Sequence, residues 1–244
     1  MEIKGFIENS LLEWEGKLSC VLFLPLCNLR CRYCHASHLL EANLLESISR
    51  QQILSYIKRQ EGWLDGAVIS GGEPTLHGEE LLGLLTDIRN AGPAIMVETN
   101  GTLPQWVERL VSEAWVDAIA MDVKAPLTAD AYRAVTRRDV DVEAVRASIR
   151  AIKRSGLPHE FRITLVPGLV GRAELEAILP DLEGARQIAL QNFKPDLCLS
   201  EPLRHVTPFT ADELKGMAAL AAAGGARVVL RGRDHAAVAA KRGS

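Results

Sequence analysis

The sequence alternates short apolar runs with longer segments of helical periodicity, and this alternation limits the possible folds more than any other feature. The apolar runs predict buried strands at 20–24, 67–70, 95–98, 118–123, 161–166 and 187–193. Apolar residues spaced three and four apart predict helices at 47–60, 79–90, 104–114, 142–155, 173–182 and 211–223. Strands that alternate with helices are typical of a parallel sheet covered by helices, so we expect an α/β fold.

The number of these strand–helix units indicates an open sheet. Six units are too few to close the eight-stranded barrel that such units can form. We therefore expect an open partial (βα)6 barrel, with a short extra strand at 227–230 on one edge. Within the 244 residues we expect a lead-in at 1–16, one domain at 17–232 and a frayed tail at 233–244.

Three of the five cysteines, Cys27, Cys31 and Cys34, lie close together directly after the first predicted strand. Three thiolates at this spacing can hold three corners of a cubane iron–sulfur cluster, whereas an ordinary electron-transfer cluster takes four cysteines. One iron would then stay open to an outside molecule. Such a cluster could support chemistry as well as electron transfer.

Other uses of these cysteines fit the sequence less well. A structural zinc site needs a fourth ligand, and Cys198 is distant and unpaired. The segment 31–35 matches the haem-attachment pattern C-x-x-C-H. Such attachment normally implies export, and no apolar signal segment precedes these residues. Haem attachment would also leave Cys27 without a role. The odd cysteine count disfavours disulfides. Cys20, inside an apolar strand, is expected to be a core residue.

Polar clusters lie at the C-terminal ends of the predicted strands, where the loops of a parallel βα barrel converge on its reactive site. After the cysteine loop they are, in strand order, Gly71-Gly72-Glu73-Pro74, Glu98-Thr99-Asn100-Gly101, Asp122 with Lys124, Arg162 and Gln191-Asn192. Their coincidence predicts one shared pocket. Glycines at 71 and 72 would let backbone approach a ligand closely.

C-x3-C-x2-C with Tyr33 before the last cysteine, followed after the next strand by a Gly-Gly-Glu segment, resembles the radical S-adenosylmethionine (radical SAM) superfamily. The resemblance implies that Cys27, Cys31 and Cys34 hold a 4Fe–4S cluster whose open iron binds SAM. It implies that one electron from the cluster breaks SAM into methionine and a 5′-deoxyadenosyl radical. The protein would orient the reactants and exclude water.

The same resemblance implies roles for the strand-end residues. The backbone of the glycine pair, with Glu73, would bind the amino group of SAM, and Lys124 would reach the carboxylate or sugar end from beside Asp122. Glu98-Thr99 matches an Asp-Thr of pyruvate formate-lyase activating enzyme, which implies a monovalent cation site beside SAM. The remaining cofactor-binding candidates are Tyr33, Pro74, Asn100, Arg162 and Gln191.

The flanking sequence, including segments 5–23, 119–126, 162–168 and 190–195, resembles the activating proteins of anaerobic ribonucleoside-triphosphate reductase. It implies that the substrate is a glycyl radical enzyme, which loses a glycine Cα hydrogen, and that the reductant is of the flavodoxin or ferredoxin type. The sequence departs from this subgroup in having Leu26 where glycine is usual, and in having Ala-Ser after Cys34-His35.

Two alternatives to a glycyl radical activase fit parts of the sequence. One is a small-molecule radical SAM enzyme such as a carboxy-deazaguanine synthase, and the other is an iron–sulfur electron carrier, which would not need the Gly-Gly-Glu segment. The net charge of −3 gives no global basic field, so we expect no nucleic acid partner. No apolar run approaches the ~18 residues that cross a membrane. We expect a cytoplasmic protein that works at low oxygen.

Overall fold

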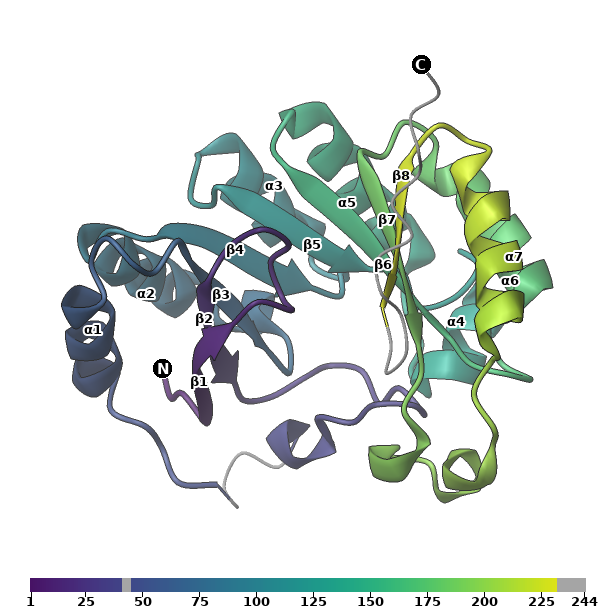
Figure 1. The fold of residues 1–244 in the computed structure, drawn as a ribbon, viewed down its shortest axis with the longest axis horizontal. Coiled ribbons are helices and arrows are strands. Elements are labelled where there is room, and N and C mark those ends of the chain that lie inside the picture. Colours follow the sequence, from purple (N-terminus) through teal and green to yellow (C-terminus); the bar gives the residue numbers. More distant parts are fainter. Residues whose placement is uncertain (41–44, 232–244) are drawn as a thin grey trace.

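The computed structural model describes residues 1–40 and 45–231, which form one open eight-stranded sheet (Figure 1). The strands pair in chain order, with β1 antiparallel to β2 and all later neighbours parallel. They are β1 (Gly5–Ser10), β2 (Ser19–Leu24), β3 (Gly66–Gly71), β4 (Ala94–Thr99), β5 (Ala118–Asp122), β6 (His159–Leu165), β7 (Gln187–Asn192) and β8 (Arg227–Arg231).

Helices follow most of the strands. They are α1 (Arg50–Arg59), α2 (Glu79–Asn90), α3 (Pro104–Ser112), α4 (Ala129–Thr136), α5 (Val142–Ser155), α6 (Arg172–Ile178) and α7 (Ala211–Ala222). Short 3-10 turns add η1 (Ser37–Leu40), η3 (Pro74–His77), η4 (Leu179–Leu182), η5 (Pro195–Leu197) and η6 (Glu201–His205). Among the described residues no helix is long and apolar enough to cross a membrane.

The predicted open partial barrel is confirmed, and the extra edge strand at 227–230 is β8. Two elements were not predicted. Strand β1 lies within the segment expected as a lead-in, and it is an edge strand whose middle residues are exposed, so it shows no apolar run. Helix α4 spans only eight residues. The expected tail at 233–244 lies outside the described residues, and the division into three segments stays a prediction.

Local sequence signals explain where the helices begin and end. The Asp141 side chain accepts a hydrogen bond from the backbone N–H of Glu143 at the start of α5, and Gly156 ends that helix with a φ of 73°. Thr210 and Glu213 cap the start of α7 reciprocally. Because each helix keeps its apolar side toward the sheet, the largest part of the core lies between the helices and one sheet face.

The other, inner face of the sheet has a small apolar cluster near the start of the strands and a polar region near their ends. The apolar cluster consists of Val21, Val68, Met96, Ala118 and Ala120, with Trp14 and Phe23 packed against it. Trp14 comes from the loop between β1 and β2, and a Cβ atom at Gly66 would lie 2.8 Å from its ring. The space that remains open on this face is therefore the polar part beyond Trp14.

Replacing Trp14 with alanine should lower the free energy of unfolding by about 2 kcal/mol, because the inner apolar cluster would lose its cover. Urea denaturation measures this loss. The matched control is Trp63→Ala, since Trp63 is 78% exposed and should change stability by less than about 0.5 kcal/mol. Equal losses in the two variants would contradict the assigned packing of Trp14.

Candidate cofactor pocket

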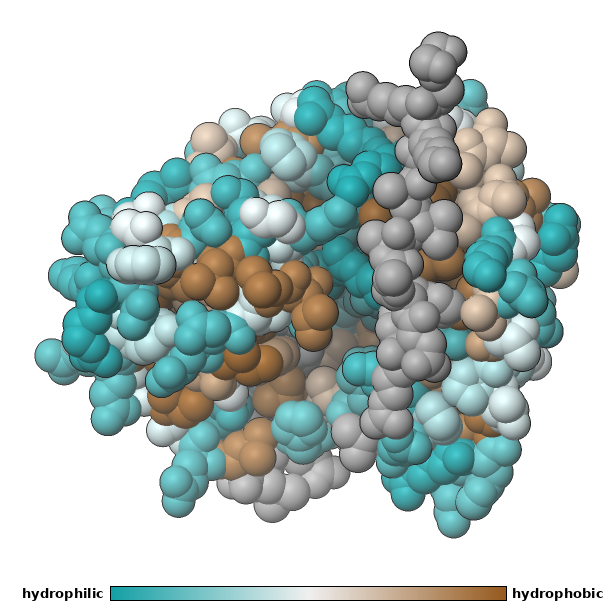
Figure 2. Space-filling view, viewed as in Figure 1, coloured by the Kyte–Doolittle hydropathy of each residue, from teal (hydrophilic) through white to brown (hydrophobic). Residues whose placement is uncertain are grey.

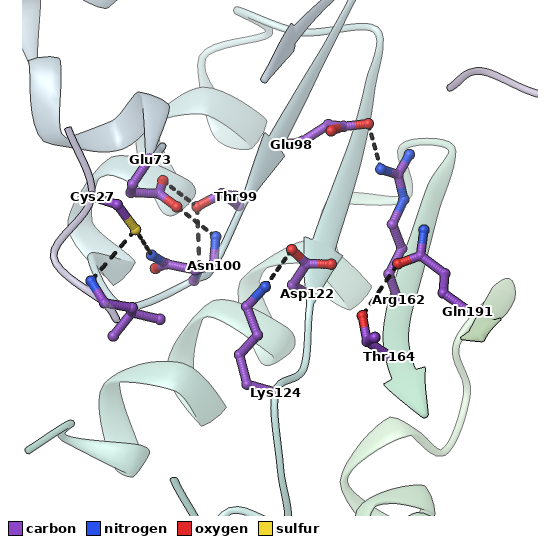
Figure 3. Close-up of polar contacts among 12 residues, drawn as sticks. Cys27, Glu73, Glu98, Thr99, Asn100, Asp122, Lys124, Arg162, Thr164 and Gln191 are labelled. Atoms are coloured by element: carbon purple, nitrogen blue, oxygen red, sulfur yellow. Dashed lines mark hydrogen bonds and ion pairs between the residues drawn. The ribbon is translucent and has the colours of Figure 1, made fainter. Parts of the chain in front are cut away.

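A cavity of about 640 Å³ lies on the inner face at the C-terminal ends of the strands. Most of the predicted site residues line it: Cys27, Cys31, Tyr33, Cys34, Gly71, Gly72, Glu98, Asn100, Asp122, Lys124, Arg162 and Gln191. In the close-up, the Asp122–Lys124 pair lies between Cys27 with Asn100 on one side and Arg162 with Gln191 on the other (Figure 3). The structure therefore brings together side chains from the cysteine loop and five consecutive strands or strand ends.

The cysteine loop presents three free thiols to this cavity. Burial raises the pKa of the Cys31 thiol to about 12 and also raises that of Cys27. The Cys27 sulfur accepts hydrogen bonds from the Leu29 backbone N–H at 3.4 Å and from Asn100 Nδ2 at 3.9 Å. N–H donors directed at a sulfur suit a metal-bound thiolate, so this donor set fits an iron–sulfur cluster.

The three thiols are not arranged as a single-ion site. In the described part of the chain, no three His, Cys, Asp or Glu side chains gather closely enough to hold one metal ion. A cubane cluster makes a different demand, because each thiolate binds its own iron.

Backbone hydrogen bonds to distant segments fix the cysteine loop. The N–H groups of Arg30 and Arg32 donate to carbonyls in the last turn of α4 at 2.9 and 3.0 Å. The carbonyls of Arg32 and Cys34 accept from the backbone of segment 199–200, at 2.9 Å each. The loop lacks regular structure of its own, so these contacts decide where its thiols lie.

The glycine pair, Gly71 and Gly72, packs against the cysteine loop as a third contact beside α4 and segment 199–200. A Cβ atom at Gly72 would lie 1.8 Å from the Leu26 carbonyl oxygen, and one at Gly71 would lie 2.2 Å from that of Leu24. The missing side chains therefore let this turn pack against the cysteine loop, in addition to lining the cavity. Leu26 itself has a φ of 69°, which favours glycine and explains why glycine suits that position.

Glu73, Pro74 and Thr99 lie beneath the cavity and do not line it. Glu73 is only 1% exposed, and its carboxylate accepts from the Asn100 N–H at 2.6 Å, from Thr99 Oγ1 at 2.7 Å and from both the hydroxyl and N–H of Thr75. Burial raises the pKa of this carboxyl, while the hydrogen bonds oppose that rise. In this way Glu73 joins the ends of β3 and β4, and its contact with the amino group of SAM stays a prediction.

Asp122 and Lys124 form an ion pair of 2.6 Å inside the cavity. Alternation along a strand would place them on opposite faces, but β5 ends at Asp122, which frees Lys124 to turn inward. Lys124 Nζ also lies 6.0 Å from the centre of the Tyr33 ring. Burial acts to lower the pKa of Lys124, but the contact with Asp122 outweighs it, and the pKa is raised. The cavity therefore contains a charged ammonium.

Arg162 is buried and binds several acceptors at once. It forms ion pairs with Glu98 and Glu160 and donates to the Glu13 carbonyl at 3.0 Å. The second carboxylate oxygen of Glu98 accepts from Ser70 Oγ at 2.6 Å. Both oxygens of Glu98, the residue expected to hold a monovalent cation, are therefore engaged by the chain's own donors.

Sequence reasoning missed several residues that line the cavity: Leu12, Glu13, Thr164, Lys194 and Arg231. Strand phase could have found Thr164, two residues from Arg162. Asn192 donates to the Phe209 carbonyl at 2.8 Å, and within residues 1–40 and 45–231 neither its buried Oδ1 nor the buried Tyr33 hydroxyl has a hydrogen-bond partner. Unpaired buried polar atoms in a cavity wall suit a polar ligand.

The wider surface shows apolar side chains gathered over β1 and β2 on the face that Figure 2 presents. In the loop after β1, Leu11 is 69% exposed and Leu12 is 79% exposed. Because Leu12 also lines the cavity, this loop gives the cavity an apolar rim.

Comparison with known proteins assigns the family. Residues 21–179, more than half of the chain, match the family described as the Radical SAM superfamily. A Methanocaldococcus jannaschii protein provisionally named a glycyl-radical enzyme activating enzyme is 28% identical over 224 residues, which cover 90% of this chain and 91% of that protein. The pyruvate formate-lyase-activating enzyme of Streptococcus mutans is 24% identical, covering 80% of this chain and 81% of its own.

Other similarities are shorter or concern the fold alone. The 7-carboxy-7-deazaguanine synthase of Hyperthermus butylicus is 33% identical over 91 residues, covering 37% of this chain and 38% of its own. Streptococcus suis SuiB bound to precursor peptide SuiA has a TM-score of 0.66 at 11% identity, covering 87% of this chain and 48% of its own. Escherichia coli coproporphyrinogen III oxidase (HemN), a radical SAM enzyme, has a TM-score of 0.58 at 14% identity, covering 84% of this chain and 52% of its own.

The matched region contains the three cysteines, the glycine pair and the Asp122–Lys124 pair, which the structure places around one cavity. The chain belongs to the radical SAM superfamily, whose enzymes use a 4Fe–4S cluster and SAM.

Proposed function

We propose that this chain activates a glycyl radical enzyme by cleaving SAM reductively and abstracting a Cα hydrogen from one glycine of that partner. The near full-length similarity to a protein named as an activating enzyme carries this assignment. The similarity to deazaguanine synthases covers less than half of the chain. Anaerobic ribonucleoside-triphosphate reductase is the partner that the flanking sequence favours.

The rim of the cavity also favours a protein substrate. Leu11 and Leu12 expose apolar surface where the cavity opens, and exposed apolar surface of this kind is suited to being covered by a partner. A small polar substrate would gain little from such a rim. A peptide loop that leaves its own fold to reach the cavity could pack against both leucines.

Different residues around the cavity would bind the cluster and SAM. Cys27, Cys31 and Cys34 would hold the cluster, which when bound supplies the electron that breaks the S–C5′ bond of SAM. The Lys124 ammonium offers a partner for the carboxylate of SAM, while Asp122 holds that ammonium in the cavity. The walls exclude water from the reacting groups.

Glu73 and Glu98 have different roles in this assignment from those first expected. Glu73 positions the Asn100 end of β4, and through Asn100 it supports the donor to the Cys27 sulfur. A monovalent cation is left out of the assignment, because Arg162 and Ser70 engage Glu98.

Reconstituted protein should bind about four irons per chain, and Cys31→Ala should abolish the cluster because a ligand is lost. Iron content and visible absorption measure this. Cys198→Ala is the matched control, since Cys198 is also buried but does not line the cavity, and it should keep the cluster. Full iron content in Cys31→Ala would show that the ligands are assigned wrongly.

Lys124→Gln and Glu73→Gln should affect different properties, namely SAM binding and stability. Lys124→Gln should weaken SAM binding roughly tenfold, about 1.4 kcal/mol, in calorimetry of the anaerobic holoenzyme. Glu73→Gln should lower the free energy of unfolding by about 2 kcal/mol, because a buried carboxylate with several donors is replaced. If Glu73→Gln weakened SAM binding without loss of stability, Glu73 would instead contact SAM as first expected.

Mixing reduced enzyme, SAM and anaerobic ribonucleoside-triphosphate reductase without oxygen should produce a glycyl radical doublet in electron paramagnetic resonance. A partner deuterated at its glycines should transfer deuterium into 5′-deoxyadenosine, because the hydrogen moves directly from the glycine Cα. A partner with alanine at the radical glycine is the control and should give neither signal.

The contrary result would be turnover of a free purine or pterin precursor while no glycyl radical protein is ever labelled. That result would assign the chain to the small-molecule radical SAM enzymes.

A further inference from the structure

Arginines gather around the side of the cysteine loop that faces away from the cavity. The set, here called the arginine surface, consists of Arg30, Arg32, Arg137, Arg138 and Arg204. It comes from three segments that backbone contacts bring together. The cysteine loop donates to the last turn of α4, directly before Arg137, and accepts from segment 199–200, next to η6 with Arg204.

The arginine surface is close to the cluster ligands but separate from the cavity. Within the cysteine loop, Cys27, Leu29, Cys31, Tyr33 and Cys34 line the cavity, whereas Arg30 and Arg32 do not. Arg137 and Arg138, directly after α4, and Arg204 on η6 do not line it either. A molecule bound to the arginine surface would therefore reach the back of the cluster loop while leaving the SAM pocket free.

Most of this positive charge is not neutralised. The Arg30 guanidinium donates to the carbonyls of Cys27 and Leu29 at 2.7 and 2.8 Å, and Arg204 donates to that of Cys198 at 3.0 Å. These acceptors are uncharged, so both arginines keep their net charge. Arg137 and Arg138 are exposed, and neither forms an ion pair within the described residues.

Acidic residues on the same segments do not balance these arginines. Asp139 pairs with Arg133, outside the set, at 2.6 Å. Asp196 on η5 and Glu201 on η6 add two negative charges. The set contains five arginines, so an excess of positive charge remains. This excess is local, because the chain as a whole has a formal net charge of −3.

We propose that the arginine surface is the docking site for a small acidic protein that carries single electrons and reduces the cluster. This role rests on the proposed function, in which SAM cleavage consumes one electron. In each encounter the carrier is oxidised by one electron and the cluster is reduced by one, and no atom or proton moves between the two proteins. Opposite charges speed such encounters and make them sensitive to salt.

A basic surface beside the cluster but outside the pocket meets two requirements of this chemistry. The electron must reach the cluster, and SAM with the substrate must occupy the pocket at the same time. A carrier docked over the pocket would block the substrate. Docking at the back of the cysteine loop avoids that conflict.

Binding of an acidic flavodoxin tests the site directly. Calorimetry of the anaerobic holoenzyme with oxidised flavodoxin should give a Kd that rises about tenfold in the R137E/R138E double variant and rises with added salt. The matched control is K58E/R59E, an adjacent exposed basic pair at the C-terminal end of α1, which Figure 1 shows at the far end of the sheet from α4. It should leave the Kd unchanged.

Comparing reaction rates with two reductants distinguishes an effect on carrier docking from an effect on SAM cleavage. With subsaturating reduced flavodoxin, R137E/R138E should form 5′-deoxyadenosine about tenfold more slowly than the wild type, and with dithionite both should react at the same rate. Arg137 has a left-handed backbone at the end of α4, so Arg138→Glu alone serves as a second variant that avoids this position. Iron content checks that each variant keeps its cluster.

Several results would overturn the docking site. Equal losses with both reductants would mean that the arginines support the cluster loop itself. An unchanged Kd in both arginine variants would place the carrier elsewhere, and equal competition by a short RNA would make the surface a general polyanion site. Failure of the proposed function is distinguishable, because flavodoxin would bind as expected while no partner glycine became labelled.

Discussion

The position of the cysteine loop depends on backbone hydrogen bonds to three distant parts of the chain. The turn after β3, the last turn of α4 and segment 199–200 each contribute donors or acceptors to it. Because the loop has no regular structure, its thiols take their places only when the sheet and both outer segments are assembled. The sheet therefore acts as the frame, and the cluster site is a product of the whole fold.

Ion pairs hold together the inner face of a sheet that never closes. Arg162 on β6 binds Glu98 on β4, and Glu160 binds both Arg162 and Arg231 on β8, the latter at 2.9 and 3.0 Å. A closed barrel would fix its strands through a complete ring of backbone hydrogen bonds. Here paired charges link alternate strands across the concave face, and because burying a charge is costly, each depends on its partners.

The sequence predicted the strands well because each is a buried apolar run, but it missed elements that lack this signal. Strand β1 has exposed middle residues, and α4 has few residues in which periodicity could appear. Spacing and strand ends also predicted many of the polar residues that line the cavity. They could not show that the Glu73 carboxylate is satisfied by its neighbours, or that Glu98 is paired with Arg162, because those partners are distant in sequence.

The cysteine loop divides the requirements of radical chemistry between its two sides. Its cavity side presents thiols, which tolerate burial, and its outer side presents arginines, which stay hydrated or bind carbonyls. The loop turns at 31–34, where the Cys34 N–H donates to the Cys31 carbonyl at 3.0 Å, and this turn brings Cys34 to the cavity beside Tyr33. Cys31 and Cys34 line the cavity whereas Arg30 and Arg32 do not, so one short loop carries the expected metal ligands and the positive charge at different places. In the proposed arrangement, SAM and the substrate occupy the pocket while the electron carrier docks outside it, so neither blocks the other.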